Sequence, residues 1–244
     1  MKIAAVFSAV TRSWLRSRSG LFFSFLFPVV LLLLLGSVYG SGSPSGEEGV
    51  TYYLPGLTAA FIMTNGVIGL TNTGSELRRN GVLKRLSTTP LTKLEWILGN
   101  VLSQTVLAVA LAMVMLVLGV LLYHAALLIN PYSAAILVLG SLLFSGVGLS
   151  LAGLVRDPEA ASGLGNLIAF PMMLLSGTFW PLAAMPSYLQ AVARVLPLTY
   201  FADGLRSSLT TADFASATLD ITVVASFALA LVLLGARYTT WKEG

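Results

Sequence analysis

Long apolar stretches without a charged side chain recur along the whole sequence, and this pattern constrains the fold more than any other feature. Such windows cover residues 20–40, 49–75, 96–155, 160–193 and 221–236. A hydrocarbon core about 30 Å thick is crossed by about 20 helical residues, so most windows have room for one crossing. The window over residues 96–155 is too long for one crossing, and the turn signal Asn130-Pro131 divides it into two.

Composition indicates the class of protein. Hydrophobic residues make up 56% of the 244 residues and charged residues only 10%, whereas soluble domains carry about 25% charged residues. We therefore expect an all-α polytopic membrane protein that forms one transmembrane domain over residues 1–244, with no cleaved leader. Six spans are predicted, near residues 20–40, 51–74, 98–123, 132–154, 160–180 and 215–236.

The distribution of cationic residues predicts the orientation of these spans. With the N-terminus inside, twelve of the fourteen lysines and arginines lie in inner segments, and only Arg194 and Arg206 lie outside. A positive-inside bias of this size predicts that both termini are cytoplasmic. The spans carry almost no ionisable side chain, so no proton relay is predicted and the energy for transport should come from elsewhere.

The sequence offers little material for catalysis. It has no cysteine and one histidine, His124, so we predict neither a thiol nucleophile nor a metal site. An intramembrane lipid-modifying enzyme is an open alternative, although Asp157 and Glu159 fit better as the acidic start of the fifth span. No G-x-x-x-x-G-K-[S/T] loop occurs, so the chain is expected to bind no nucleotide or other cofactor itself, and no nucleic acid.

Residues 1–19 have the pattern of a helix that lies in the inner membrane interface. Apolar residues recur at helical spacing, and basic residues take the opposite side. The segment either anchors the first span or acts as a lever or gate beside the entry route of a substrate. Its apolar positions are Ile3, Phe7, Val10 and Trp14.

The longest inner segment between two spans, from Glu76 to Asn100, predicts a short amphipathic helix. Leucines and Val82 supply its apolar side, basic residues its other side, and Pro90 disfavours helix at the residue before it. One interpretation is a basic loop that faces anionic lipid. The other is a helix that contacts a protein partner.

Residues 176–197, SGTFWPLAAMPSYLQAVARVLP, interrupt the apolar pattern after the fifth span. Three prolines and Arg194 exclude a straight spanning helix. Irregular backbone at membrane depth is tolerated only where it is packed in protein or lines a cavity, so we predict a re-entrant lid over residues 181–200. The alternative is an interfacial helix with Trp180 and Tyr188 as aromatic anchors. The residues assigned to this external gate are Pro181, Pro186, Tyr188, Leu189 and Pro197.

Three stretches carry a family resemblance: ELRRNGVLKRLSTTPL, DPEAASGLGNLIAFPM and residues 176–206. They resemble the membrane subunit of the type-2 ATP-binding-cassette (ABC) exporters, a family that includes drug-efflux and polysaccharide-export systems. The resemblance covers nearly the whole chain, with Asn80 standing where members often carry an acidic residue. It implies a multi-pass subunit of the cytoplasmic membrane of a prokaryote, paired with a second copy of itself and surrounded by membrane lipid.

The resemblance also implies how the subunit is energised. Residues 76–90 are similar to a coupling helix, which docks in a groove of a separate ATPase subunit. Two copies of that ATPase would bind ATP and Mg, and the chain itself would have no catalytic site. The residues that this resemblance assigns to coupling are Glu76, Arg78, Arg79, Gly81, Val82, Leu83, Lys84, Arg85, Leu86, Thr89 and Pro90.

Polar residues within the second and fifth spans are candidates for a substrate path, with the start of the first span contributing. Polar side chains in hydrocarbon usually turn toward protein or water, although small polar residues also serve only to pack helices together. The uncharged path suits a hydrophobic or amphipathic drug or lipid-like molecule, with a lipid-linked polysaccharide as the alternative. The candidates are Thr64, Asn65, Asn72, Asn166, Ser176, Gly177, Phe179 and Trp180.

Overall fold

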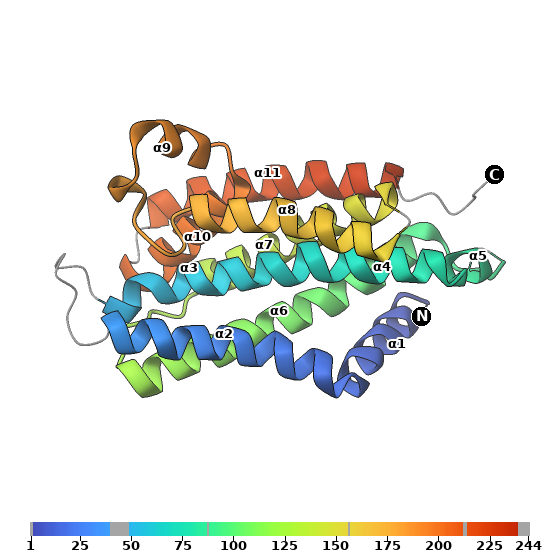
Figure 1. Cartoon of the computed structure of the whole chain (residues 1–244), viewed down its shortest axis with the longest axis horizontal. Helices are drawn as coiled ribbons and strands as arrows, with labels where there is room; N and C mark the ends of the chain where they lie inside the picture. Colours follow the sequence, from blue (N-terminus) through green and yellow to red (C-terminus); the bar gives the residue numbers. More distant parts are fainter. Residues whose placement is uncertain (1, 40–48, 87, 156, 212–213, 239–244) are drawn as a thin grey trace.

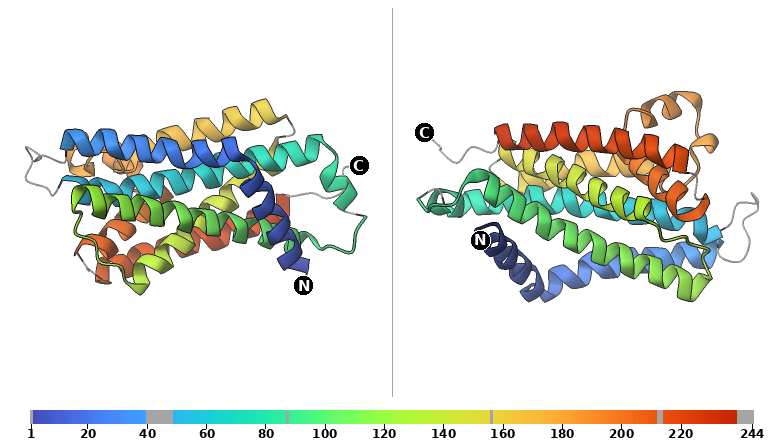
Figure 2. Two further views of the ribbon diagram at one scale, coloured as in Figure 1. Left: turned by 90° about the horizontal axis from the view of Figure 1, so that it is seen from below. Right: turned by 180° about the vertical axis from the view of Figure 1, so that it is seen from behind.

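The computed structural model describes all residues except 1, 40–48, 87, 156, 212–213 and 239–244. Within the described residues, all regular structure is helical and no strand occurs. This confirms the predicted all-α class. The long helices run side by side along the long axis of the molecule, as Figures 1 and 2 show. Their bounds are α2 Arg18–Tyr39, α3 Gly49–Thr64, η1 Asn65–Gly69, α4 Leu70–Arg79, α6 Lys93–Tyr123, α7 Pro131–Leu154, α8 Pro158–Leu175 and α11 Phe214–Tyr238.

Four helical stretches are long and apolar enough to cross a membrane: Gly20–Val38, Gly49–Arg79, Lys93–Tyr123 and Pro131–Leu154. The second stretch is one continuous rod made of α3, the π-helix η1 and α4. The helix α8 has 18 residues and a polar first turn, and the shorter apolar stretch in α11 is Ser216–Leu231. A multi-pass membrane protein is therefore supported, and the count of six spans stays a prediction.

The ends of the long helices follow from local side-chain chemistry. Thr92 and Glu95 form a capping box at the start of α6, in which each side chain bonds the other residue's backbone N–H. Asn130 and Ser133 form the same arrangement before α7, with Pro131 in the first turn. The predicted turn at Asn130-Pro131 is thereby confirmed as the division of the long apolar window.

Close backbone contacts hold the centre of the bundle together. A Cβ atom on Gly148 of α7 would lie 2.3 Å from the carbonyl oxygen of Gly66 in η1, so only glycine permits this approach. Nearby, Phe144 and Phe201 are fully buried with ring centroids 5.9 Å apart. The core therefore ties the middle of the second rod to α7 and to the short helix α10, Pro197–Arg206.

The two ends of the bundle differ in the elements that they carry. The helix α1, Lys2–Arg16, the short helix α5, Val82–Leu86, and the C-terminal end of α11 lie at one end (Figures 1 and 2). The helices α9, Ser187–Ala193, and α10 lie at the other end. This arrangement places the basic inner segments together, as the charge distribution predicts, while their side of the membrane stays a prediction.

Candidate functional site

A cavity of about 480 Å³ opens between α2, α3, η1 and α8. Its wall is mainly apolar and aromatic, and none of the described residues that line it is charged. The polar groups of Thr64 and Asn65 bond back to their own helix, with the hydroxyl donating to Ala60 and the amide to Phe61 at 2.8 and 2.9 Å. A guest would therefore meet mostly apolar surface, to which Phe27, Phe61, Phe170 and Phe179 contribute aromatic rings.

The structure brings only part of the predicted substrate path to this cavity. Thr64, Asn65 and Phe179 line it, together with the middle of α2. Asn72 and Ser176 lie elsewhere, and each keeps a buried oxygen without a hydrogen-bond partner in the described part of the chain. Gly177 forms a left-handed turn with φ +70°, Trp180 is half exposed, and Asn166 lies outside the cavity wall. The role of each as a path residue stays a prediction.

The π-helix η1 is a feature that sequence reasoning missed. It places Asn65 beside the cavity in the middle of the second rod, where the backbone pattern changes from α to π. Single π turns within α-helices are frequent at functional sites. The two glycines in NGVIG were the available signal, but their spacing does not distinguish a π turn from close helix packing.

A second cavity of about 580 Å³, the inner cavity, lies between α1, α4, α6 and the chain after α5, at the end of the bundle that is predicted to face the cytoplasm. The helix α1 is held over it by three contacts. Lys2 Nζ donates to the Pro90 carbonyl at 2.5 Å, and the Thr11 and Ser103 hydroxyls lie 2.9 Å apart. Val6 packs closely on Gly99: a Cβ atom added to Gly99 would lie only 2.5 Å from Cγ1 of Val6. The predicted interfacial helix therefore contacts α6 and the segment that follows α5.

The predicted coupling helix over residues 76–90 is not one helix. The helix α4 ends at Arg79, and Gly81 has φ +65°, a left-handed conformation that stops a helix. The short helix α5 then runs over Val82–Leu86, and the hydroxyls of Thr88 and Thr89 donate to the carbonyls of Arg85 and Leu86 at its end. The helix α4 contains both the end of the predicted second span and the start of the predicted coupling helix. Glu76, Arg78 and Arg79 therefore belong to the second rod.

The side chains around α5 divide into inward and outward groups. Leu83 is buried in a small core with Trp96 and Leu149. Arg78 also points inward, because it donates to the Gly153 carbonyl at 3.0 Å. The exposed side chains of this region include those of Arg79, Lys84, Arg85, Thr89 and Pro90, with Val82 and Leu86 partly buried beside them.

The turn between α7 and α8 contacts this segment. Arg79 lies 3.6 Å from Glu159, in an exposed ion pair of small energetic value. The pKa of Asp157 lies below its usual value, first because the Glu159 side chain hydrogen-bonds to it and then because the Ala160 N–H donates to its carboxylate. Asp157 is thus the N-cap of α8, as its acidic character predicted.

The predicted re-entrant segment folds as several short elements after α8, which ends at Leu175 and not near Trp180. Pro181 precedes a 3-10 turn over Leu182–Ala184, and Pro186 precedes α9. Tyr188 in α9 is exposed and Leu189 partly buried, whereas α10 begins at Pro197 and buries Leu198, Phe201, Ala202 and Leu205 fully. How deeply these elements enter a membrane stays a prediction.

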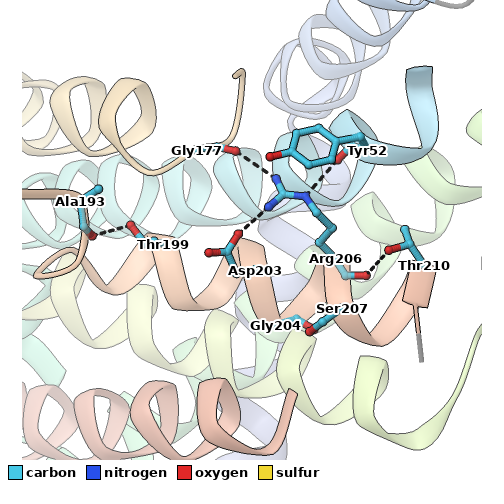
Figure 3. A network of polar contacts seen from close by, with 9 residues as sticks. All are labelled: Tyr52, Gly177, Ala193, Thr199, Asp203, Gly204, Arg206, Ser207 and Thr210. Atoms are coloured by element: carbon cyan, nitrogen blue, oxygen red, sulfur yellow. Dashed lines mark hydrogen bonds and ion pairs between the residues drawn. The ribbon is translucent and has the colours of Figure 1, made fainter. Parts of the chain in front are cut away.

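Arg206 joins the predicted re-entrant segment to the start of α3 and to the chain after α8, as Figure 3 shows. Its guanidinium donates to the carbonyls of Tyr52 and Gly177 at 3.2 and 3.0 Å and to the Asp203 carboxylate. Thr199 also donates to the Ala193 carbonyl at 2.7 Å, which fixes the turn between α9 and α10. Charge counting placed Arg206 outside but gave no sign of these partners.

Long apolar helices around an internal cavity, with an amphipathic helix at one end, indicate an all-helical, multi-pass membrane protein. The chain belongs to the ABC-2 type transporter family, whose sequence pattern matches residues 1–210. The resemblance to type-2 ABC permeases is thereby confirmed.

Three relatives show the range of similarity. The linearmycin resistance permease protein LnrN of Bacillus subtilis is 34% identical over 158 residues, which are 62% of this chain and 39% of that protein. The daunorubicin resistance ABC transporter permease protein DrrB1 of Streptomyces coeruleorubidus is 25% identical over 74% of this chain and 65% of its own. The inner membrane transport permease YadH of Escherichia coli is 24% identical over 84% of this chain and 79% of its own.

Proposed function

We propose that the chain is the transmembrane subunit of an ATP-driven exporter that moves a hydrophobic or amphipathic molecule, drug or lipid-like, out across the cytoplasmic membrane of a prokaryote. The observation that carries this proposal is the aromatic, uncharged cavity between α2, α3, η1 and α8. Its volume of about 480 Å³ falls within the range of about 300 to 1,000 Å³ typical of sites for small molecules. The resistance permeases among its relatives support the same substrate class.

The energy source in this proposal is a separate ATPase present in two copies, which binds ATP and Mg, together with a second copy of this chain. The surface that would receive the ATPase is the exposed side of α5 and of the turns around it. Its basic residues Arg79, Lys84 and Arg85 suit carboxylates at the edge of a groove. Nucleotide binding would move α5, and α4 would carry that movement along the second rod to Asn65 and the cavity.

Gly81 offers the sharpest test of this coupling. A side chain at Gly81 would meet nothing within 4 Å, so a substitution there acts through the backbone alone. Proline cannot adopt its φ of +65°, whereas asparagine tolerates that conformation better than most residues. We would co-express the chain with the ABC ATPase encoded beside it, reconstitute the pair, and measure ATP hydrolysis and co-purification.

Gly81→Pro should reduce the stimulation of hydrolysis by an amphipathic substrate, and Gly81→Asn should retain it. Unchanged association and unchanged hydrolysis in Gly81→Pro would count against coupling through α5. Hydrolysis stimulated by a lipid-linked polysaccharide and not by amphipathic drugs would instead favour the alternative substrate.

A further inference from the structure

The inner cavity contains an acidic group that coupling does not explain. Glu76 lies near the end of α4 and lines this cavity, although the sequence had assigned it to the ATPase contact. Among the described residues that line the cavity, Glu76 is the one with a charged side chain. Its carboxylate forms no ion pair with another described residue, whereas the neighbouring Arg78 and Arg79 both have partners.

The rest of the cavity wall is suited to an organic molecule. Trp14 of α1 and Trp96 of α6 both line it, and Val6, Val10 and Leu77 add apolar surface. A largely apolar wall with two tryptophans and one carboxylate favours a cation that carries apolar groups, because tryptophan rings and the carboxylate both attract positive charge. The basic residues Arg12 and Arg16 of α1 are exposed and are not among the lining residues.

This inner cavity and the aromatic transmembrane cavity are neighbours. A narrow space of about 20 Å³ lies between them, and it shares Trp14 with the inner cavity. It shares Ser24 and Asn65 with the transmembrane cavity. The three spaces therefore follow one another from the inner end of the bundle to its middle, with Trp14 and Asn65 at the constriction.

We propose that the inner cavity is an access site that selects organic cations, and that Glu76 determines this selectivity. The inference rests on the proposed export function and adds a substrate class to it, namely amphipathic cations with aromatic or quaternary ammonium groups. A soluble organic cation and the choline headgroup of a membrane lipid present the same chemistry to the cavity, and the test below distinguishes them.

The test measures binding to the full chain alone in nanodiscs of phosphatidylethanolamine and phosphatidylglycerol. Equilibrium dialysis with tetraphenylphosphonium, corrected for empty nanodiscs, gives the dissociation constant of an aromatic cation. Triphenylphosphine oxide serves as a neutral molecule of similar shape. Glu76→Gln should weaken tetraphenylphosphonium binding about fivefold or more, the size expected when one charge attraction is removed. Binding of the neutral molecule should not change, and this also shows that the cavity is intact.

Two further variants sharpen the result. Glu159→Gln removes another inner carboxylate that lies outside the cavity wall, and it should leave both dissociation constants unchanged. Glu76→Lys should reverse the preference, so that the anion tetraphenylborate binds better than tetraphenylphosphonium. Lower tetraphenylphosphonium affinity in phosphatidylcholine nanodiscs, absent in Glu76→Gln, would identify the lipid headgroup as a competing cation.

Equal losses for the cation and the neutral molecule in Glu76→Gln would overturn the inference, because they would show a general disturbance of the cavity. Unchanged binding of both would overturn it as well. Coupled ATP hydrolysis is a separate measurement on the complex with the ATPase. If Glu76→Gln left the preference for the cation unchanged while the complex still hydrolysed ATP in response to substrate, the access site would be contradicted. The proposed export function would not be affected.

Discussion

The guanidinium carbon of Arg206 lies 4.1 Å from the centre of the Tyr52 ring, and its Nε also donates to the Tyr52 carbonyl. The same side chain is 13% exposed and donates to the Gly177 carbonyl, so one arginine holds the start of α3, the end of α10 and the chain after α8 together (Figure 3). These segments form the end of the bundle opposite α5.

Arg206→Ala should lower the thermal stability of the purified chain. It leaves buried carbonyls without their charged donor, and the loss of such bonds costs about 2 kcal/mol. Thermal unfolding in detergent, followed by tryptophan fluorescence, measures the effect. Arg194→Ala is the matched control, because Arg194 is exposed and its side chain has no bond among the described residues. Equal melting temperatures for Arg206→Ala and the wild type would contradict the assigned role.

Local patterns predicted the long helices well. The apolar windows and the turn at Asn130-Pro131 depend on residues that are near one another in sequence, and the structure places helix boundaries close to them. The end of the fifth helix was predicted five residues too late, because Gly177 leaves the helix in a left-handed turn before the apolar pattern ends. Local helix propensity could not predict this turn, because the turn is stabilised by a hydrogen bond from Arg206, which is distant in the sequence, to the Gly177 carbonyl.

The candidate sites were harder to predict, because their residues are sorted by contacts between distant segments. The sequence assigns Arg78 and Leu83 to the contact with the ATPase, yet α7 supplies a carbonyl that binds Arg78, and residues of α6 and α7 bury Leu83. The polar residues of the second rod were equally ambiguous. Asn65, the first residue of η1, reaches the cavity, and Asn72, in α4, does not.

Gly148→Ala should destabilise the chain through the central contact between α7 and η1. The new Cβ would lie 2.3 and 2.9 Å from the carbonyl oxygens of Gly66 and Val67, which are backbone atoms and cannot turn away. Overpacking of this kind costs about 1 to 3 kcal/mol. Gly163→Ala in α8 is the control, since its Cβ would meet nothing within 4 Å. That control should be neutral or stabilising, and a similar loss in both variants would show that the effect is not the close contact.

Phe179→Ala should weaken binding of an aromatic amphipathic dye to the transmembrane cavity. Phe179 lines that cavity, whereas its neighbour Trp180 is 48% exposed and does not. Loss of one aromatic contact should raise the dissociation constant of rhodamine 6G about fivefold, as measured by fluorescence polarisation. Trp180→Ala should have little effect. A larger effect of Trp180→Ala than of Phe179→Ala would place the binding surface outside this cavity.

Single cysteines test the predicted orientation, because the natural sequence has none. Thr88 follows α5 and Ser187 begins α9, and both are exposed at opposite ends of the bundle. In intact cells, a membrane-impermeant maleimide should label Ser187→Cys and leave Thr88→Cys unlabelled until the membrane is opened. Labelling of both from outside would contradict the arrangement of spans, and the reverse pattern would invert the orientation.

A disulfide between α1 and α6 should distinguish the two interpretations of the N-terminal helix. The Thr11 and Ser103 side-chain oxygens lie 2.9 Å apart, so cysteines at both positions are within reach of a disulfide. If α1 is a gate over the inner cavity, oxidation of the double variant should stop transport by the complex, and a reductant should restore it. Each single cysteine should be insensitive to oxidation. Full transport by the cross-linked protein would instead identify α1 as a fixed anchor, and substrate would then have to enter the inner cavity without displacing Val6, Val10 or Trp14.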